Sequence, residues 1–174
     1  SSSLEIVNTA PSLNSATISL NQAATDENVT VMATMSDVDG DQTTMSITWY
    51  LDGVIQLEYN NQATLPFSAT NKGESWTAVV QANDGETTSS QSETLSVLIV
   101  NSDPLLSVAL ENATSQDELA LQMSISDIDD DVTEVSTITW FRNGFREGSL
   151  DGASIVPSSH LGPGQEWSVE VNVT

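Results

Sequence analysis

The sequence contains no cysteine among its 174 residues and only three basic residues, Lys72, Arg142 and Arg146. Without cysteine the chain has no disulfide framework and no thiol chemistry. The 25 Asp and Glu residues give a formal net charge of −22, which makes nucleic acid and anionic membranes poor partners. His160 is the single histidine, so acid–base or nucleophilic catalysis has little basis and we expect no enzyme.

Long apolar runs are also absent from the sequence. No segment approaches the roughly 20 apolar residues that a helix needs to cross a bilayer, so we expect no membrane insertion. Hydrophobic residues still make up 38% of the chain, and four of them are tryptophans. This apolar content is enough to build a folded core despite the charge.

Apolar residues alternate with Ser, Thr and Asn along most of the chain. This period of two is typical of half-buried antiparallel strands, and turn residues such as Asp-Gly and Asn-Gly separate the runs. The alternating runs occupy residues 29–35, 47–51, 76–82, 95–99, 119–125, 138–140 and 167–173. The pattern predicts an all-β protein made of antiparallel sandwiches.

An internal repeat divides the chain into two units. Trp49 matches Trp140 and Trp76 matches Trp167, each pair 91 residues apart (140 − 49 and 167 − 76). The segment around Pro104 matches the one around Pro11. We therefore predict an N-terminal strand and linker at 1–10, a first domain at 11–100 and a second at 101–174. The second domain stops before a counterpart of the strand at 94–100, so we expect it to lack its last strand.

Short signatures recur in a set order within the units: N-x-x-P, SDVDGD, ITWYLDG and, after a Gly turn, WTAVVQANDG. This order resembles the immunoglobulin-like and PKD-like tandem repeats of bacterial and archaeal cell-surface proteins. The resemblance implies two tandem immunoglobulin-like β-sandwiches in an extracellular spacer, adhesin, filament or surface-layer component, which in some cases binds calcium. We therefore expect the protein outside the cell or on its surface.

The N-terminal segment has the pattern of the missing strand. Leu4, Ile6 and Val7 match Val97, Ile99 and Val100, so this segment is a candidate polymer contact. Inserted into the second domain of another copy, it would add a strand by β-augmentation and build a head-to-tail homopolymer. We interpret the chain as a subunit of an extracellular filament. The alternative is a stalk or spacer segment of a longer surface-layer or adhesin protein. A segment taken from the middle of a long tandem array would also begin in one repeat and stop in another.

Clustered aspartates predict cation sites at the turns. Alternating carboxylates direct several hard oxygen ligands to one point, which is the arrangement that Ca²⁺ prefers. The candidate ligands are Asp37, Asp39, Asp41 and Asp84 in the first domain, and Asp103, Asp127, Asp129 and Asp131 at and beyond the linker. The alternative is that these are solvated turn residues, since Asp is favoured in turns without any metal.

The tryptophans raise a third function, that of a carbohydrate-binding accessory module of a secreted enzyme. The repeated positions of the tryptophans favour the core over a sugar-stacking platform, which leaves Tyr50 and Phe141 as candidates for glycan contact. Asn28, Asn112 and Asn172 begin Asn-x-Thr triplets and are weak candidates for glycosylation. Glycans or other surface proteins are the further partners that this setting allows.

Overall fold

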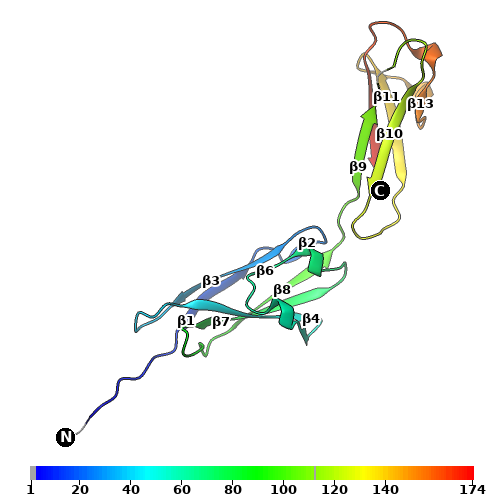
Figure 1. Cartoon of the computed structure of the whole chain (residues 1–174). Helices are drawn as coiled ribbons and strands as arrows, with labels where there is room; N and C mark the ends of the chain where they lie inside the picture. Colours follow the sequence, from blue (N-terminus) through cyan, green and yellow to red (C-terminus); the bar gives the residue numbers. More distant parts are fainter. Residues whose placement is uncertain (1–2, 112) are drawn as a thin grey trace. The chain divides into compact units, whose positions relative to one another are not determined.

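The computed structural model describes residues 3–111 and 113–174 and divides the chain into two compact units, Ser1–Asn101 (unit 1) and Ser102–Thr174 (unit 2). Both units are built from β-strands joined by turns and short 3₁₀ helices, as Figure 1 shows. Each unit has two sheets whose inner faces enclose one hydrophobic core. Each is described separately below.

Unit 1 is a sandwich of a three-stranded and a five-stranded sheet. The strands are β1 (Ser12–Ile18), β2 (Gln22–Ala24), β3 (Val29–Ser36), β4 (Thr44–Leu51), β5 (Val54–Ile55), β6 (Thr64–Leu65), β7 (Ser75–Asn83) and β8 (Glu93–Val100). The sheet orders are β1-β3-β6 and β2-β8-β7-β4-β5. The pairs are antiparallel except that β2 runs parallel to β8. This strand order is that of an immunoglobulin-like sandwich.

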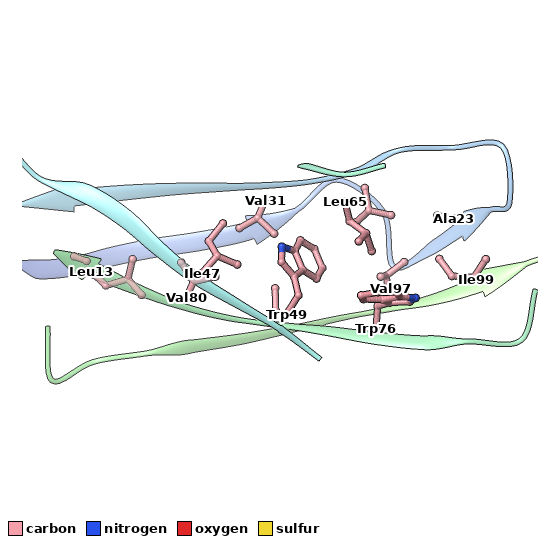
Figure 2. Packing of buried hydrophobic residues seen from close by; sticks show 13 residues of the cluster. Leu13, Ala23, Val31, Ile47, Trp49, Leu65, Trp76, Val80, Val97 and Ile99 are labelled. Carbon is pink, nitrogen blue, oxygen red and sulfur yellow. The ribbon is translucent and has the colours of Figure 1, made fainter. Parts of the chain in front are cut away.

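The core of unit 1 follows from the alternation in the sequence. In β7 the residues Trp76, Ala78, Val80 and Ala82 are buried, while the residues between them are half-buried. Trp49 packs edge-to-face against Trp76 with ring centroids 6.4 Å apart, and its indole N–H donates to the carbonyl of Gln62 at 2.9 Å. Figure 2 shows both rings among the aliphatic side chains of the facing sheet.

Unit 2 repeats this scheme with fewer strands. It contains β9 (Leu105–Leu110), β10 (Leu119–Ser126), β11 (Val135–Arg142), β12 (Phe145–Arg146), β13 (Ile155–Val156) and β14 (Trp167–Val173). The sheet orders are β13-β10-β9 and β12-β11-β14. Trp140 packs edge-to-face against Trp167 at 6.3 Å and donates to the carbonyl of Ala153 at 2.8 Å. The repeat seen in the sequence is thus also a repeat of packing geometry.

The two predicted sandwiches are present, and among the described residues unit 2 has no strand in the position that β8 holds in unit 1. In unit 1 the strand β7 pairs with β4 on one edge and β8 on the other. Its counterpart β14 pairs with β11 and lies at the edge of its sheet. Among the residues that the structure describes, the core of unit 2 is also smaller, with six buried hydrophobic side chains against 13 in unit 1.

Matched core truncations test whether the two sandwiches unfold separately. Ile47 and Ile138 hold equivalent positions in β4 and β11 and are 1% and 8% exposed. Ile47→Ala should cost unit 1 about 2–4 kcal/mol, and Ile138→Ala should cost unit 2 a similar or smaller amount. Because its core is smaller, unit 2 should unfold at lower denaturant concentration. Denaturant titration followed by tryptophan fluorescence should resolve two transitions, each shifted by one variant. A single transition that both variants shift equally contradicts this expectation.

Candidate functional site

The turn between β3 and β4 carries the first aspartate cluster. Oδ1 of Asp37 accepts hydrogen bonds from the backbone N–H of Asp39 at 2.7 Å and from that of Asp41 at 3.3 Å. Between these two residues, Gly40 has φ +86°, a conformation that glycine adopts without strain. The Asp37 side chain therefore organises the turn and brings its acidic neighbours around itself.

The turn between β10 and β11 has the same construction in unit 2. Oδ1 of Asp127 accepts from the N–H of Asp129 at 2.7 Å and from that of Asp131 at 3.4 Å. Asp130 occupies the position of Gly40 and adopts a left-handed φ of 58°. An aspartate tolerates this conformation better than most residues with a Cβ, so the turn keeps its shape after losing the glycine.

Each turn brings together three carboxylates that can hold a metal ion. The oxygens of Asp37, Asp39 and Asp41 lie within 4.8 Å of one another, and so do those of Asp127, Asp129 and Asp131. In unit 1 the second oxygen of Asp37, Oδ2, is buried and accepts no hydrogen bond. A buried carboxylate oxygen without a donor is costly, so this donor set fits a bound cation.

Each acidic turn also holds the linker that enters its unit. The N–H of Thr9 donates to Oδ2 of Asp39 at 2.7 Å, and the N–H of Ser102 donates to Oδ2 of Asp129 at 2.8 Å. Thr9 and Ser102 each follow the asparagine of an N-x-x-P segment. Sequence reasoning did not identify these two contacts, although the recurrence of N-x-x-P before each unit was the available signal.

Asp84 lies in the β7–β8 loop and belongs to neither cluster. Its carboxylate accepts from the N–H groups of Thr87 at 2.6 Å and Glu86 at 2.8 Å, and from the side chains of Asn8 at 2.9 Å and Thr87 at 3.0 Å. These bonds, led by that from the Thr87 backbone, hold the pKa of Asp84 far below its ordinary value of 3.8. Asp84 thus fastens the loop and the linker residue Asn8. Asp103, the remaining ligand candidate, is exposed and outside both clusters.

The tryptophans are core residues, as the sequence predicted. Trp49, Trp76 and Trp140 are at most 1% exposed, so their rings offer no face to a sugar. Trp167 is half-buried, because unit 2 has no described strand at the position where β8 covers Trp76. Tyr50 and Phe141, the candidates for glycan contact, are also half-buried and lie in the central strands β4 and β11.

The other candidate residues are distributed over the surface. Leu4, Ile6 and Val7 are 87%, 84% and 73% exposed in a segment outside the sheets. Asn28 is exposed beside β3, and Asn172 is exposed on β14, where its amide donates to Thr137 at 2.7 Å. Asn112 lies outside the described residues. Across the described residues, no helix has the length and apolar character needed to span a membrane.

Comparison with known proteins gives no family. No family description and no curated protein matches the chain. Among solved structures it is similar to a chimeric titin Z1Z2 carrying a decorin peptide, with 17% identity, 81% of this chain and 73% of that chain covered, and a TM-score of 0.37.

Two further structures are similar at comparable levels. The chicken CNTN1 FN1-FN3 domains share 11% identity over 94% of this chain with a TM-score of 0.33, and this chain spans 58% of their length. The fibronectin(III)-like modules of Clostridium thermocellum CbhA share 16% identity over 91% of this chain and 84% of that chain, with a TM-score of 0.27. The immunoglobulin-like assignment rests on strand order and register.

The Asp84 contacts predict how acid affects unit 1. Folding lowers the pKa of Asp84, so its stabilising contribution is present above pH 4 to 5 and is lost as the pH falls below the ordinary value of 3.8. Asp84→Asn should therefore destabilise unit 1 most at pH 7 and progressively less toward pH 3. Denaturant unfolding of unit 1 at several pH values measures this difference. Asn8→Ala, which removes one donor, should show the same trend with smaller amplitude, whereas an equal cost at pH 3 and pH 7 contradicts the assignment.

Proposed function

We propose that the chain is a spacer portion of an extracellular surface protein, in which each immunoglobulin-like unit fixes the linker that enters it. The observation that supports this proposal is the hydrogen bond made by the same acidic turn to the entering linker in both units, from Thr9 to Asp39 and from Ser102 to Asp129. A spacer sets the distance between the parts that it joins, so the linker needs a fixed conformation at each point where the chain enters a unit.

We further propose that the turns take up Ca²⁺. Ca²⁺ binds six to eight oxygen ligands, and each cluster supplies three carboxylates with water able to complete the shell. The buried, unpaired Oδ2 of Asp37 provides a ligand that no protein donor already uses. Extracellular modules bind Ca²⁺ at about 10⁻⁴–10⁻³ M, the range expected for a site on a surface turn. In this position the ion would neutralise the carboxylates that hold each linker.

The composition supports an extracellular setting. A net charge of −22 keeps the chain soluble but opposes its compact state by self-repulsion, and divalent cations relieve that repulsion. The chain also contains no cysteine, so its stability does not depend on redox conditions.

Calcium should stabilise both units and order both linkers. With a Kd of about 1 mM, about 10 mM Ca²⁺ should add about 1.4 kcal/mol to the unfolding free energy of each unit. Asp37→Asn should abolish this gain in unit 1 only, and Asp127→Asn in unit 2 only, because each variant removes a central ligand. Thermal unfolding measures the gain, and ¹⁵N relaxation of the Thr9 and Ser102 amides measures linker order.

The controls separate binding from general screening. NaCl at matched ionic strength should produce a smaller gain, and Glu93→Gln, which removes an exposed charge remote in sequence from both turns, should leave the Ca²⁺ effect intact. If Asp37→Asn and Asp127→Asn respond to Ca²⁺ as the unaltered chain does, the ion sites are wrong. If the Thr9 and Ser102 amides remain as mobile as residues 3–5 in Ca²⁺, the spacer function is wrong.

A second candidate function is a filament formed by strand exchange between copies. Leu4, Ile6 and Val7 are 87%, 84% and 73% exposed, and they have the sequence pattern of the end of β8. Unit 2 in turn presents the strand edge that β8 covers in unit 1. Leu4 and Ile6 alternate with Glu5, as side chains on one face of a strand do, so a partner sheet would bury both.

Removal of residues 1–7 tests this candidate function. The intact chain should form assemblies larger than a monomer in a concentration-dependent manner, whereas the shortened chain should remain monomeric because the donated strand is gone. Sedimentation velocity and electron microscopy give the sizes and shapes of the particles. Intact chains that remain monomeric at high concentration contradict the filament and leave the spacer function unaffected.

A further inference from the structure

One of the Asn-x-Thr triplets lies at a position that suits N-glycosylation. Asn28 is exposed immediately before β3, after a turn in which the N–H of Glu27 donates to the carbonyl of Ala24 at 3.0 Å. A glycan is bulky and is attached to the side-chain nitrogen Nδ2, so it requires a surface position and space at that atom. The contacts of each asparagine side chain therefore decide which triplet can carry a glycan in the folded protein.

Asn28 contacts its unit through the oxygen of its side-chain amide. Oδ1 accepts a hydrogen bond from the backbone N–H of Phe67 at 2.8 Å, and so caps the 3₁₀ helix η2 (Phe67–Ala69). Within the described part of the chain, Nδ2 of Asn28 makes no hydrogen bond. A glycan on Nδ2 thus leaves the contact with η2 in place.

Asn172 uses its side-chain nitrogen in a different way. It lies within β14, directly opposite Thr137 of β11, and its Nδ2 donates to Oγ1 of Thr137 at 2.7 Å. A sugar on this nitrogen would crowd the strand pair, because opposite residues have Cβ atoms only about 5 Å apart. The third triplet begins at Asn112, outside the described residues. Of the two asparagines that the structure describes, Asn28 is the one that can accept a sugar without losing a contact.

An aromatic ring lies beside the attachment point. Phe67, whose backbone N–H holds Asn28, has a side chain that is 40% exposed. The C–H groups on the apolar face of a sugar pack on the face of an aromatic ring, since that face carries negative charge density. The first sugar on Asn28 would therefore cover apolar surface that the protein leaves in contact with water.

Unit 2 has neither the asparagine nor the ring. The strand pairs β3–β6 and β10–β13 are equivalent, which aligns Asn28 with Glu118 and Phe67 with Ser158. The 3₁₀ helix forms in both units, as η2 and as η4 (Ser158–His160), so it requires neither residue. The asparagine and the exposed ring occur together in unit 1 and are replaced together in unit 2, as expected of two parts of one site.

We propose that Asn28 carries an N-linked glycan whose first sugar packs on Phe67. The donor is an oligosaccharide joined to a lipid through diphosphate: the bond between C1 of the sugar and the diphosphate oxygen breaks, C1 bonds to Nδ2, and Nδ2 gives up one proton. Transfer precedes the pairing of β3, because Thr30 of the triplet is half-buried in the folded unit, where its hydroxyl pairs with that of Thr64 at 3.1 Å. This proposal rests on the extracellular setting of the proposed function, since such glycans are added to secreted chains.

Export of the full 174-residue chain from a cell that N-glycosylates secreted proteins tests the site. Most exported chains should carry a glycan at Asn28 and few at Asn172, and Asn28→Gln should remove the glycan. Peptide mass spectrometry after enzymatic release of the glycan in ¹⁸O water marks each occupied asparagine. Exported chains that are unmodified at Asn28 overturn the proposal.

The organism that makes the protein separates this proposal from the proposed function. A chain found outside the cell with Asn28 unmodified contradicts the glycan and leaves the spacer function unaffected. A chain found inside the cell contradicts the spacer function itself.

Stability measurements test the contact with Phe67. In the transition of unit 1, the glycosylated chain should unfold at higher denaturant concentration than the same chain made in a host that adds no glycan. Trimming the glycan to its first sugar should preserve this gain, because that sugar makes the contact. Phe67→Ser, which introduces the residue that unit 2 has at this place, should remove the gain without changing the occupancy of Asn28.

A matched control shows whether the effect belongs to this ring. Phe145 is a more exposed phenylalanine, 78% exposed on β12 of unit 2, and Phe145→Ser should leave the gain intact. A gain that persists in Phe67→Ser, or a glycosylated chain that is no more stable than the unmodified one, overturns the contact between the sugar and Phe67.

Discussion

Both sandwiches depend on one buried indole in the third long strand. Trp49 and Trp140 each donate to a backbone carbonyl 13 residues later, that of Gln62 and of Ala153, and each packs against a second tryptophan at about the same angle, 73° and 74°. The ring fixes the distance between the sheets and also satisfies a carbonyl in the loop. The other inward-facing residues fill the space that this ring defines.

The long strands and the core could be predicted from the sequence because they are determined by the pattern of apolar and polar side chains. Period-two alternation located the long strands, and the repeated tryptophans marked the core. The three-residue strand β2, parallel to β8, was too short to show a period. The linker contacts were missed for a different reason: their donors are the backbone amides of Thr9 and Ser102, so the side-chain types at these positions do not indicate them, and only the recurrence of N-x-x-P marks the segment.

Local geometry decides which of the candidate metal ligands lie together in a cluster and which lie apart. Asp37, Asp39 and Asp41 could be grouped in advance because a tight turn brings alternate side chains together. Asp84 was grouped with them by fold analogy, but its nearest donors are Glu86 and Thr87 in its own loop, and these use its oxygens first. Oδ2 of Asp37, by contrast, is buried and accepts no hydrogen bond, so that oxygen is not used by a neighbouring donor.

Charge also affects β14, which lies at the edge of its sheet among the described residues of unit 2. β14 alternates inward apolar residues with the outward-facing Ser168, Glu170 and Asn172, and Glu166 immediately precedes it. Acidic side chains on an exposed edge oppose pairing with arbitrary strands, above all with strands of another molecule whose net charge is also −22. A strand could pair here only if the apolar surface it buries outweighed this repulsion. The acidic side chains on this edge therefore disfavour pairing with strands that bury little apolar surface.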